Sequence, residues 1–168
     1  MKTIKDFNKL YDEHVGIVRS ILYRMCPRQD LDDLTQECFI KAWKNIDSFR
    51  GDSSFATWIR RIAVHVAYDY YRRRAVRPQT EELDETTQTE VARGPLEDLL
   101  NKQLVQNLFE TLDADHRSVL VLHVLEELSL EEVASILEIK IGTVKSRLFY
   151  AREAARKFLI SKGVDYGS

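Results

Sequence analysis

The sequence predicts an all-α fold made of two small helical domains. Apolar residues recur at three- and four-residue spacing through most of the 168-residue chain, and the alternation typical of strands is absent. Hydrophobic residues make up 44% of the chain, which is enough to build two cores. An acidic stretch without helical periodicity separates the two periodic regions, so we expect a flexible linker between two domains.

Three amphipathic helices are expected before the linker. Their apolar stripes are marked by Phe7, Leu10, Tyr11, Val18, Ile21, Leu22 and Met25 in the first helix, Leu31, Leu34, Cys38, Ala42 and Ile46 in the second, and Phe55, Ile59, Ile62, Val66 and Tyr70 in the third. Pro27 ends the first helix. Between the second and third helices, Gly51 suits an irregular backbone, and Asp52, Ser53 or Ser54 can cap the helix that follows.

The linker is recognised by an abrupt change of charge. Residues 60–77 are strongly basic, whereas residues 79–90 contain five acids and no cation. Proline and glycine flank this acidic stretch at Pro78, Gly94 and Pro95. We therefore expect a first domain at 1–74, a linker at 75–94, a second domain at 95–162 and a frayed tail at 163–168.

The second domain is expected to contain four helices and a helix-turn-helix motif. Its periodic segments are residues 96–112, 117–127, 129–139 and the stretch that opens at 141. Ser129 and Glu132 have the spacing of a capping box, which gives the third of these helices a defined start. Only a short link at 138–140 precedes the last helix, and this spacing is typical of a helix-turn-helix.

The last helix presents two contrasting faces. Val144, Leu148, Ala151, Ala155 and Phe158 recur at steps of four and three, so they form the core stripe. The other side carries base-edge donors, phosphate-binding cations and aromatic rings: Thr143, Lys145, Ser146, Phe149, Tyr150, Arg152 and Arg156. A solvated basic face is the plainer alternative, but the capped helix, the short turn and the small Gly142 favour insertion into a DNA major groove.

Composition and residue spacing argue against a metalloprotein, an enzyme and a membrane protein. The formal charge is only −2, so any electrostatic function depends on how charge is distributed. Cys26 and Cys38 lack the spacing of metal ligands and are interpreted as small buried hydrophobic residues. We expect no metal, no cofactor and no catalytic residue. Without a membrane span or signal sequence, a cytoplasmic location is expected. The features described so far fit both a helix-turn-helix regulator and a helical interaction module.

The segments 30–74 and 125–159 together carry a resemblance to a known family. The first, DLDDLTQECFIKAWKNIDSFRGDSSFATWIRRIAVHVAYDYYRRR, resembles the second domain of bacterial sigma factors, and LEELSLEEVASILEIKIGTVKSRLFYAREAARKFL resembles their fourth. A chain with these two domains and a linker is similar to the extracytoplasmic-function (ECF) sigma factors. The resemblance implies a factor that binds core RNA polymerase, through its largest and second-largest subunits, and directs it to promoter DNA. An anti-sigma partner is also implied, whereas the expectation of no membrane insertion comes from the lack of a long apolar stretch. The alternative that stays open is a helix-turn-helix regulator that acts without being a polymerase subunit.

The resemblance assigns polymerase contacts to the second helix. The implied residues are Asp33, Leu34, Gln36, Glu37, Phe39 and Trp43, with Asp33, Gln36 and Glu37 as the polar contacts. From the residues alone, a helix N-terminus with favourable acids explains this segment equally well.

The resemblance likewise assigns two DNA-binding surfaces. The downstream promoter element would be met by Phe49, Arg50, Ser53, Ser54, Trp58, Arg61, His65, Arg72 and Arg73, and the upstream element by His123, Glu131, Thr143, Lys145, Ser146, Phe149, Tyr150, Arg152 and Arg156. Trp58 could equally be a core residue. His65 stands where the family most often has asparagine, so an altered base preference and a structural histidine both stay open. The acidic linker could mimic nucleic acid or be a simple soluble spacer.

Overall fold

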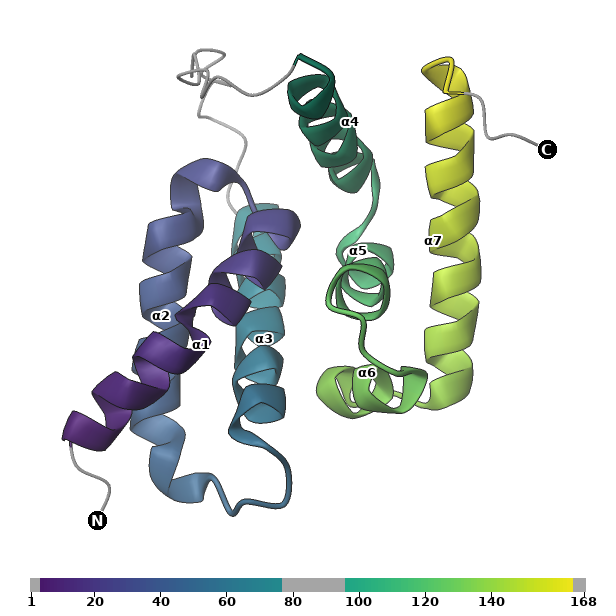
Figure 1. The fold of residues 1–168 in the computed structure, drawn as a ribbon. Coiled ribbons are helices and arrows are strands. Elements are labelled where there is room, and N and C mark those ends of the chain that lie inside the picture. The colour runs from purple at the N-terminus through teal and green to yellow at the C-terminus, as the bar shows by residue number, and fades with distance from the viewer. Residues whose placement is uncertain (1–3, 77–95, 165–168) are drawn as a thin grey trace.

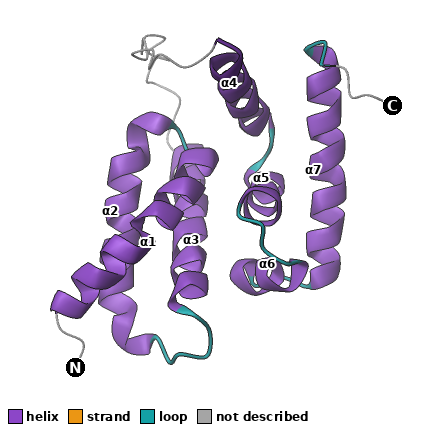
Figure 2. Ribbon diagram, viewed as in Figure 1, coloured by secondary structure: helices purple, strands orange, loops and turns teal. Residues whose placement is uncertain are grey.

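The computed structural model describes residues 4–76 and 96–164, and every regular element within these ranges is helical (Figure 2). The first half contains α1 (Ile4–Met25), α2 (Leu31–Asn45) and α3 (Phe55–Val76), and the second contains α4 (Leu96–Thr111), α5 (Ala114–Leu120), α6 (Leu130–Leu137) and α7 (Ile141–Ser161). Short helical turns follow α1 at Arg28–Asp30 and α2 at Ile46–Ser48, and a π-helical turn at Val121–Leu125 extends α5. The predicted all-α fold is confirmed.

The first three helices form a bundle around a shared apolar core (Figure 1). Val18, Ile21 and Leu22 of α1 are fully buried against Ile59 and Val64 of α3. At about 1.5–3 kcal/mol for each large side chain removed from water, such residues supply most of the stabilisation of a small bundle. Most residues of the expected stripes are core, but Tyr11 is 39% exposed, and five others are only half-buried: Phe7, Leu10, Leu31, Phe55 and Ile62.

Both cysteines lie in this core as free thiols, as the sequence predicts. Desolvation by burial raises the pKa of each thiol to about 12. Neither group is therefore a thiolate at neutral pH.

The helix-turn-helix of the second half is built as the sequence predicts. Ser129 accepts a hydrogen bond from the Glu132 amide at 3.1 Å, and the Glu132 carboxylate accepts one from the Ser129 amide at 2.8 Å. This reciprocal capping box fixes the start of α6. The helix before it begins earlier than expected, at Ala114, because Asp113 caps it by accepting a hydrogen bond from the His116 amide at 2.8 Å.

The two halves pack against each other, which differs from the expected pair of separate bundles on a tether. Figure 1 shows α3 beside α5 and α6, and α1 also contacts the segment after α5. Across this boundary the Tyr68 hydroxyl donates a hydrogen bond of 2.9 Å to Asp115, and Ser20 donates one of 2.7 Å to Glu126. Polar contacts of this kind leave no periodic signal in a sequence, so the packing could not be predicted from it.

The ends of the linker can be placed only in part. Helix α3 continues to Val76, so Ala75 and Val76, which were assigned to the linker, are helical. The remaining linker residues up to Gly94, including all its acids, lie outside the described residues, as do positions 165–168 of the tail. No helix in the described ranges is both long and apolar enough to cross a membrane.

Candidate nucleic-acid and polymerase interfaces

The outer face of α7 carries exposed aromatic and basic side chains. Phe149 and Tyr150 are 62% and 61% exposed, whereas Val144, Leu148 and Ala151 on the opposite face are buried. Large rings with so much exposed surface are uncommon on a helix without a partner. The two predicted faces of α7 are therefore real, although Ala155 and Phe158 of the inner stripe are only half-buried.

The cations of this face differ in how they are engaged. Lys145 and Arg152 are exposed, and among the described residues neither takes part in an ion pair. Arg156 pairs with Glu153 at 3.1 Å, and Arg147, at the side of the helix, pairs with Asp115 at 2.9 Å. The free cations are therefore available to an anionic ligand such as a DNA phosphate.

The remaining upstream candidates lie before α6, in its first turn and in the first turns of α7. Glu131 is exposed in the first turn of α6, and Thr143 and Ser146 lie in the first turns of α7. His123 is half-buried, and its Nδ1 lies 2.7 Å from the Leu128 carbonyl oxygen. That contact gives His123 a structural role in the turn before α6.

An aromatic cluster surrounds the loop between α2 and α3. Phe49 lies 5.7 Å from Phe55 and 5.3 Å from Trp58 between ring centroids, and Phe55 also contacts His14. Trp58 is half-buried against the core. Core packing and DNA contact are therefore compatible interpretations, because part of the side chain packs and part is exposed. Clustered rings at a loop are suited to stacking against an unpaired base.

The capping and basic residues of this loop complete the downstream candidates. Of the three candidate caps, Ser54 accepts a hydrogen bond from the Thr57 amide at 3.1 Å, so it caps α3. Arg50 is exposed, and Ser53 is half-buried beside it. The loop therefore offers a cation next to the aromatic cluster that has no ion pair in the described part of the chain.

The basic end of α3 is tied to α2 by a network of charges. Lys41 lies 3.1 Å from Glu37 and 2.9 Å from Asp69, while Arg73 lies 3.1 Å from Glu37 and Arg72 lies 3.3 Å from Asp69. Partial burial works to raise the pKa of Glu37, but hydrogen bonds from Arg73 and Lys41 outweigh it and hold that pKa below its ordinary value. The network thus links a candidate polymerase contact to two candidate DNA contacts.

The other polymerase candidates divide into exposed and buried groups. Asp33 and Gln36 are exposed on α2, and Trp43 is 40% exposed beside Phe7. Leu34 and Phe39 are buried in the core. A partner docked on α2 would therefore touch the polar residues and Trp43, while Leu34 and Phe39 support them from beneath.

Two downstream candidates face the second half of the protein. Arg61 donates a hydrogen bond of 2.8 Å to the Ser135 carbonyl and pairs with Glu138 at 3.4 Å. The Nε2 of His65 lies 3.9 Å from the other carboxylate oxygen of Glu138. The third helix of the first bundle is thus bound to the helix-turn-helix through residues that were predicted to bind DNA.

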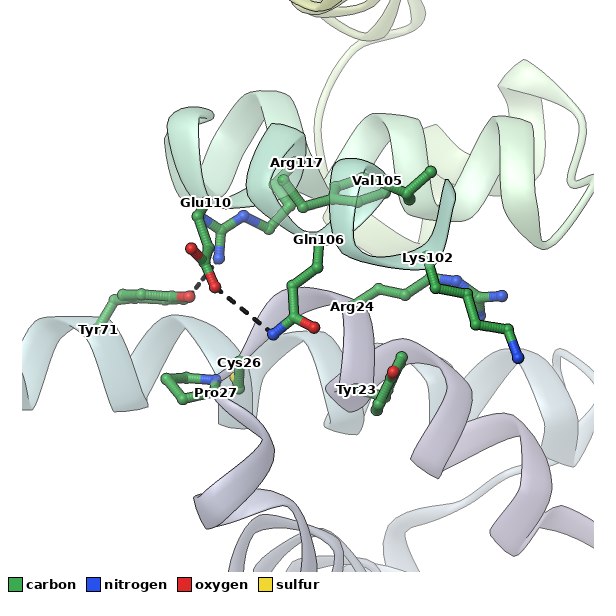
Figure 3. Close-up of a pocket in the computed structure, with 11 residues that line it drawn as sticks. Tyr23, Arg24, Cys26, Pro27, Tyr71, Lys102, Val105, Gln106, Glu110 and Arg117 are labelled. Atoms are coloured by element: carbon green, nitrogen blue, oxygen red, sulfur yellow. Dashed lines mark hydrogen bonds between the residues drawn. The ribbon is translucent and has the colours of Figure 1, made fainter. Parts of the chain in front are cut away.

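The boundary between the halves also contains a cavity of about 560 Å³ (Figure 3). Its walls come from the end of α1, from Tyr71 and from α4 and α5, and Figure 3 shows Arg117 beside Tyr71. The buried Arg117 donates hydrogen bonds to the Met25 carbonyl at 2.7 Å, to the Leu112 carbonyl at 2.8 Å and to the Tyr71 hydroxyl. It anchors the second half to the first.

Sequence reasoning missed the residues of this boundary. Arg117 opens an otherwise apolar run, RSVLVLHVL, and a cation in such a run is the signal that could have identified a buried polar anchor. Tyr68 and Glu138 have no comparable signal. No group of His, Cys, Asp and Glu side chains in the described ranges has a geometry suited to a metal ion.

Comparison with known proteins defines the class. Residues 10–77 match the family model of sigma-70 region 2, and residues 102–154 match that of sigma-70 region 4. The ECF RNA polymerase sigma-E factors of Escherichia coli K12 and Haemophilus influenzae are each 38% identical to this chain, over 89% of it and 84% and 85% of their own lengths. These matches define a bacterial sigma factor.

Solved structures agree in fold. The structure of CnrH in complex with the cytosolic domain of CnrY covers 95% of this chain and 90% of its own with a TM-score of 0.69 and 25% identity. That of the sigma factor RpoE with the anti-sigma factor NepR from Bartonella quintana covers 93% and 98%, also with a TM-score of 0.69, at 24% identity. The chain belongs to the ECF family of RNA polymerase sigma factors. It binds core RNA polymerase, recognises promoter DNA and initiates transcription.

Proposed function

We propose that the two halves of this sigma factor divide promoter recognition between them. The second half, residues 95–162, reads the upstream element with α7 in the major groove. The observation that carries this proposal is the outer face of α7, which presents exposed Phe149 and Tyr150 together with Lys145 and Arg152, two cations without an ion pair among the described residues. Lysine can donate to guanine acceptors and a ring can contact a thymine methyl group.

The first half, residues 1–74, takes the downstream element. Phe49 and Trp58 offer rings on which a flipped base can stack, at about 1–3 kcal/mol per base, which offsets much of the cost of unpairing. Arg61, Arg72 and Arg73 supply phosphate contacts along α3, and Arg50 and Ser53 line the loop. His65 would face a base or the backbone near the flipped position.

Polymerase binding is assigned to the exposed face of α2. Asp33, Gln36 and Glu37 supply the polar contacts, and Trp43 supplies an exposed apolar one. Acidic side chains on the first turns of a helix with one aromatic anchor suit a basic, rigid partner surface. The largest and second-largest polymerase subunits are the proposed partners.

An anti-sigma factor is a further proposed partner. The sigma factor RpoE from Bartonella quintana shares this fold, and its solved structure is a complex with the anti-sigma factor NepR. We also propose that the protein works in the cytoplasm, where its polymerase acts, and that it performs no catalysis of its own.

A run-off transcription assay with core polymerase tests this division. Lys145→Ala should weaken initiation at promoters that depend on the upstream element, whereas Trp58→Ala should impair opening on double-stranded templates only. Asp33→Asn combined with Gln36→Ala should reduce binding to core polymerase and leave the melting temperature unchanged. Equal activity of all three variants and the wild type would overturn the assignment.

A further inference from the structure

The cavity between the two halves is large enough for a small molecule. Its volume is about 560 Å³, within the range of about 300–1,000 Å³ that is usual for ligand pockets. The end of α1 and Tyr71 of α3 form one wall, and residues of α4 together with Arg117 of α5 form the other (Figure 3). A molecule bound here would therefore contact both halves of the protein.

The walls of the cavity are mainly apolar and aromatic. Tyr23, Pro27 and Tyr71 line it from the first half, and Val105 and Phe109 line it from α4. Aromatic rings attract one another in edge-to-face and offset arrangements. Tyr23 is 40% exposed and Val105 is 45% exposed, so apolar surface is accessible to a ligand. An aromatic body fits the chemistry of these walls.

Arg117 brings a buried positive charge to the cavity. The residue is 6% exposed, and its guanidinium has no ion pair among the described residues. Its terminal nitrogens donate to two backbone carbonyls and to the Tyr71 hydroxyl, and its Nε is buried without a hydrogen-bond partner in the described ranges. A buried cation is costly when none of its partners is charged. A bound anion would lower this cost.

Two ionisable groups that interact with Arg117 do not supply that anion. Burial raises the pKa of the Tyr71 hydroxyl and raises the pKa of the Cys26 thiol to about 12, although the charge of Arg117 lowers both. Both groups are therefore neutral at pH 7. The Met25 carbonyl lies in the last turn of α1, where the helix end carries about half a negative charge. This helix end compensates Arg117 only in part.

The charged side chains around the cavity also favour a negative ligand. Among the described residues that line it, Arg24, Lys102 and Arg117 are cations and Glu110 is the one acid. Arg24 is partly neutralised by Glu126 at 3.8 Å, whereas Lys102 is exposed and has no ion pair in the described part of the chain. An excess of positive charge around a cavity with apolar walls attracts anions.

We propose that this cavity binds a small aromatic carboxylate, whose negative group pairs with Arg117 and whose ring packs against Tyr71 and Phe109. A guanidinium binds a carboxylate through charge-assisted hydrogen bonds. None of the residues that line the cavity belongs to the proposed DNA or polymerase surfaces, so this is a separate site. Because the ligand contacts both halves, its binding stabilises their packing.

The first test compares a charged probe with a neutral one of the same shape. The full-length protein, without polymerase or DNA, is titrated calorimetrically with 2-naphthoate and with 2-naphthamide. The carboxylate should bind at least about tenfold more tightly than the amide, as expected for hydrogen bonds between charged groups. Equal affinities, or no binding of 2-naphthoate, would overturn the proposal.

A matched pair of substitutions on α4 tests the position of the ligand. Val105→Trp fills the cavity from an exposed part of its wall, and Gln103→Trp places the same ring at an exposed position outside the lining. Val105→Trp should weaken binding of 2-naphthoate at least about tenfold, because the indole takes the space of the ligand. Gln103→Trp should bind like the wild type, and equal affinities of the two variants would count against this cavity.

Arg117→Gln tests the origin of the preference for an anion. Without the guanidinium, the preference for 2-naphthoate over 2-naphthamide should disappear, and a preserved preference would refute the pairing. Since loss of a buried anchor can prevent folding, hydrogen exchange of the wild type gives a second measurement. Bound 2-naphthoate should slow amide exchange in residues 105–110 and 117–119. Slower exchange only in other segments would place the ligand elsewhere and overturn the proposal.

Discussion

Arg73 at the end of α3 lies 3.1 Å from Glu37 of α2, so a candidate DNA contact and a candidate polymerase contact share one ion pair. Lys41 joins the same carboxylate and extends the network to Asp69. Binding of either macromolecule at this edge of the bundle would change the electrostatic environment of the other site. The network also stabilises the bundle in a manner that depends on pH.

Acid should weaken the bundle through Glu37 and Asp69. Burial raises the pKa of each carboxyl, but contacts with Lys41 and the neighbouring arginines outweigh it, so both folded-state pKa values lie below the ordinary 4.5 and 3.8. Their stabilisation is full above those ordinary values and is lost as pH falls through the lower folded values. Lys41→Met should flatten this acid limb and cost at most about 1 kcal/mol, because the groups are partly exposed.

Urea unfolding from pH 7 to pH 3 measures this effect. Lys9→Met is the matched control, because it breaks only an exposed pair with Glu13 at 3.8 Å. An acid limb that Lys41→Met leaves as steep as in the wild type would rule out the network as its source.

Trp58→Ala should slow promoter opening about tenfold, because one stacked base contributes on the order of 1.4 kcal/mol. Permanganate reactivity of unpaired thymines measures the opened DNA. Trp58→Phe should keep most of the activity, and a template melted in advance should restore the alanine variant. A lowered melting temperature with no rescue by the melted template would instead assign Trp58 to the core.

His65→Asn should change which bases are preferred in the downstream element. Asparagine offers an amide donor and acceptor in place of an imidazole, so the hydrogen bonds available to a nearby base differ. Sequencing the start sites that the polymerase complex selects from a promoter library would reveal the change. The same ranking of promoters for both proteins would make His65 a structural residue.

Lys145→Ala should weaken binding at the upstream element, and its salt dependence identifies the kind of contact. Loss of a phosphate contact lowers the salt slope by about one and affects all sequences alike, whereas loss of a base contact relaxes specificity at one position. Lys162→Ala is the control, since Lys162 follows α7 and lies over the Phe158 ring. Equal losses for both lysines would indicate a general charge effect.

Ser129→Ala should destabilise the helix-turn-helix by about 1 kcal/mol, because it removes the capping box of α6. Ser129→Asp should restore most of the loss, since aspartate is an equally good cap. Hydrogen exchange in α6 is the direct measurement. Unchanged protection in the alanine variant would show that packing by Val133 and Ile136 alone defines the helix.

Structure formed by residues close in sequence could be predicted, whereas the contacts between the two halves of the protein could not. Helical spacing identified the buried stripes, and the Ser129 and Glu132 pair gave the start of α6. The contact between Arg61 and Glu138 joins residues 77 positions apart, and nothing in either segment indicates the other. Leu34 and Phe39 were both assigned by resemblance to a docking surface, and both are buried. The burial of Leu34 agrees with its place on the predicted apolar stripe, whereas Phe39 lies outside that stripe.

The burial of Cys26 and Cys38 determines how readily their thiols can be oxidised. Oxidants react with thiolates, and the raised pKa values leave these two sulfurs protonated throughout the physiological range. Oxidation of either sulfur would therefore require the core of the first bundle to open and expose the thiol to solvent.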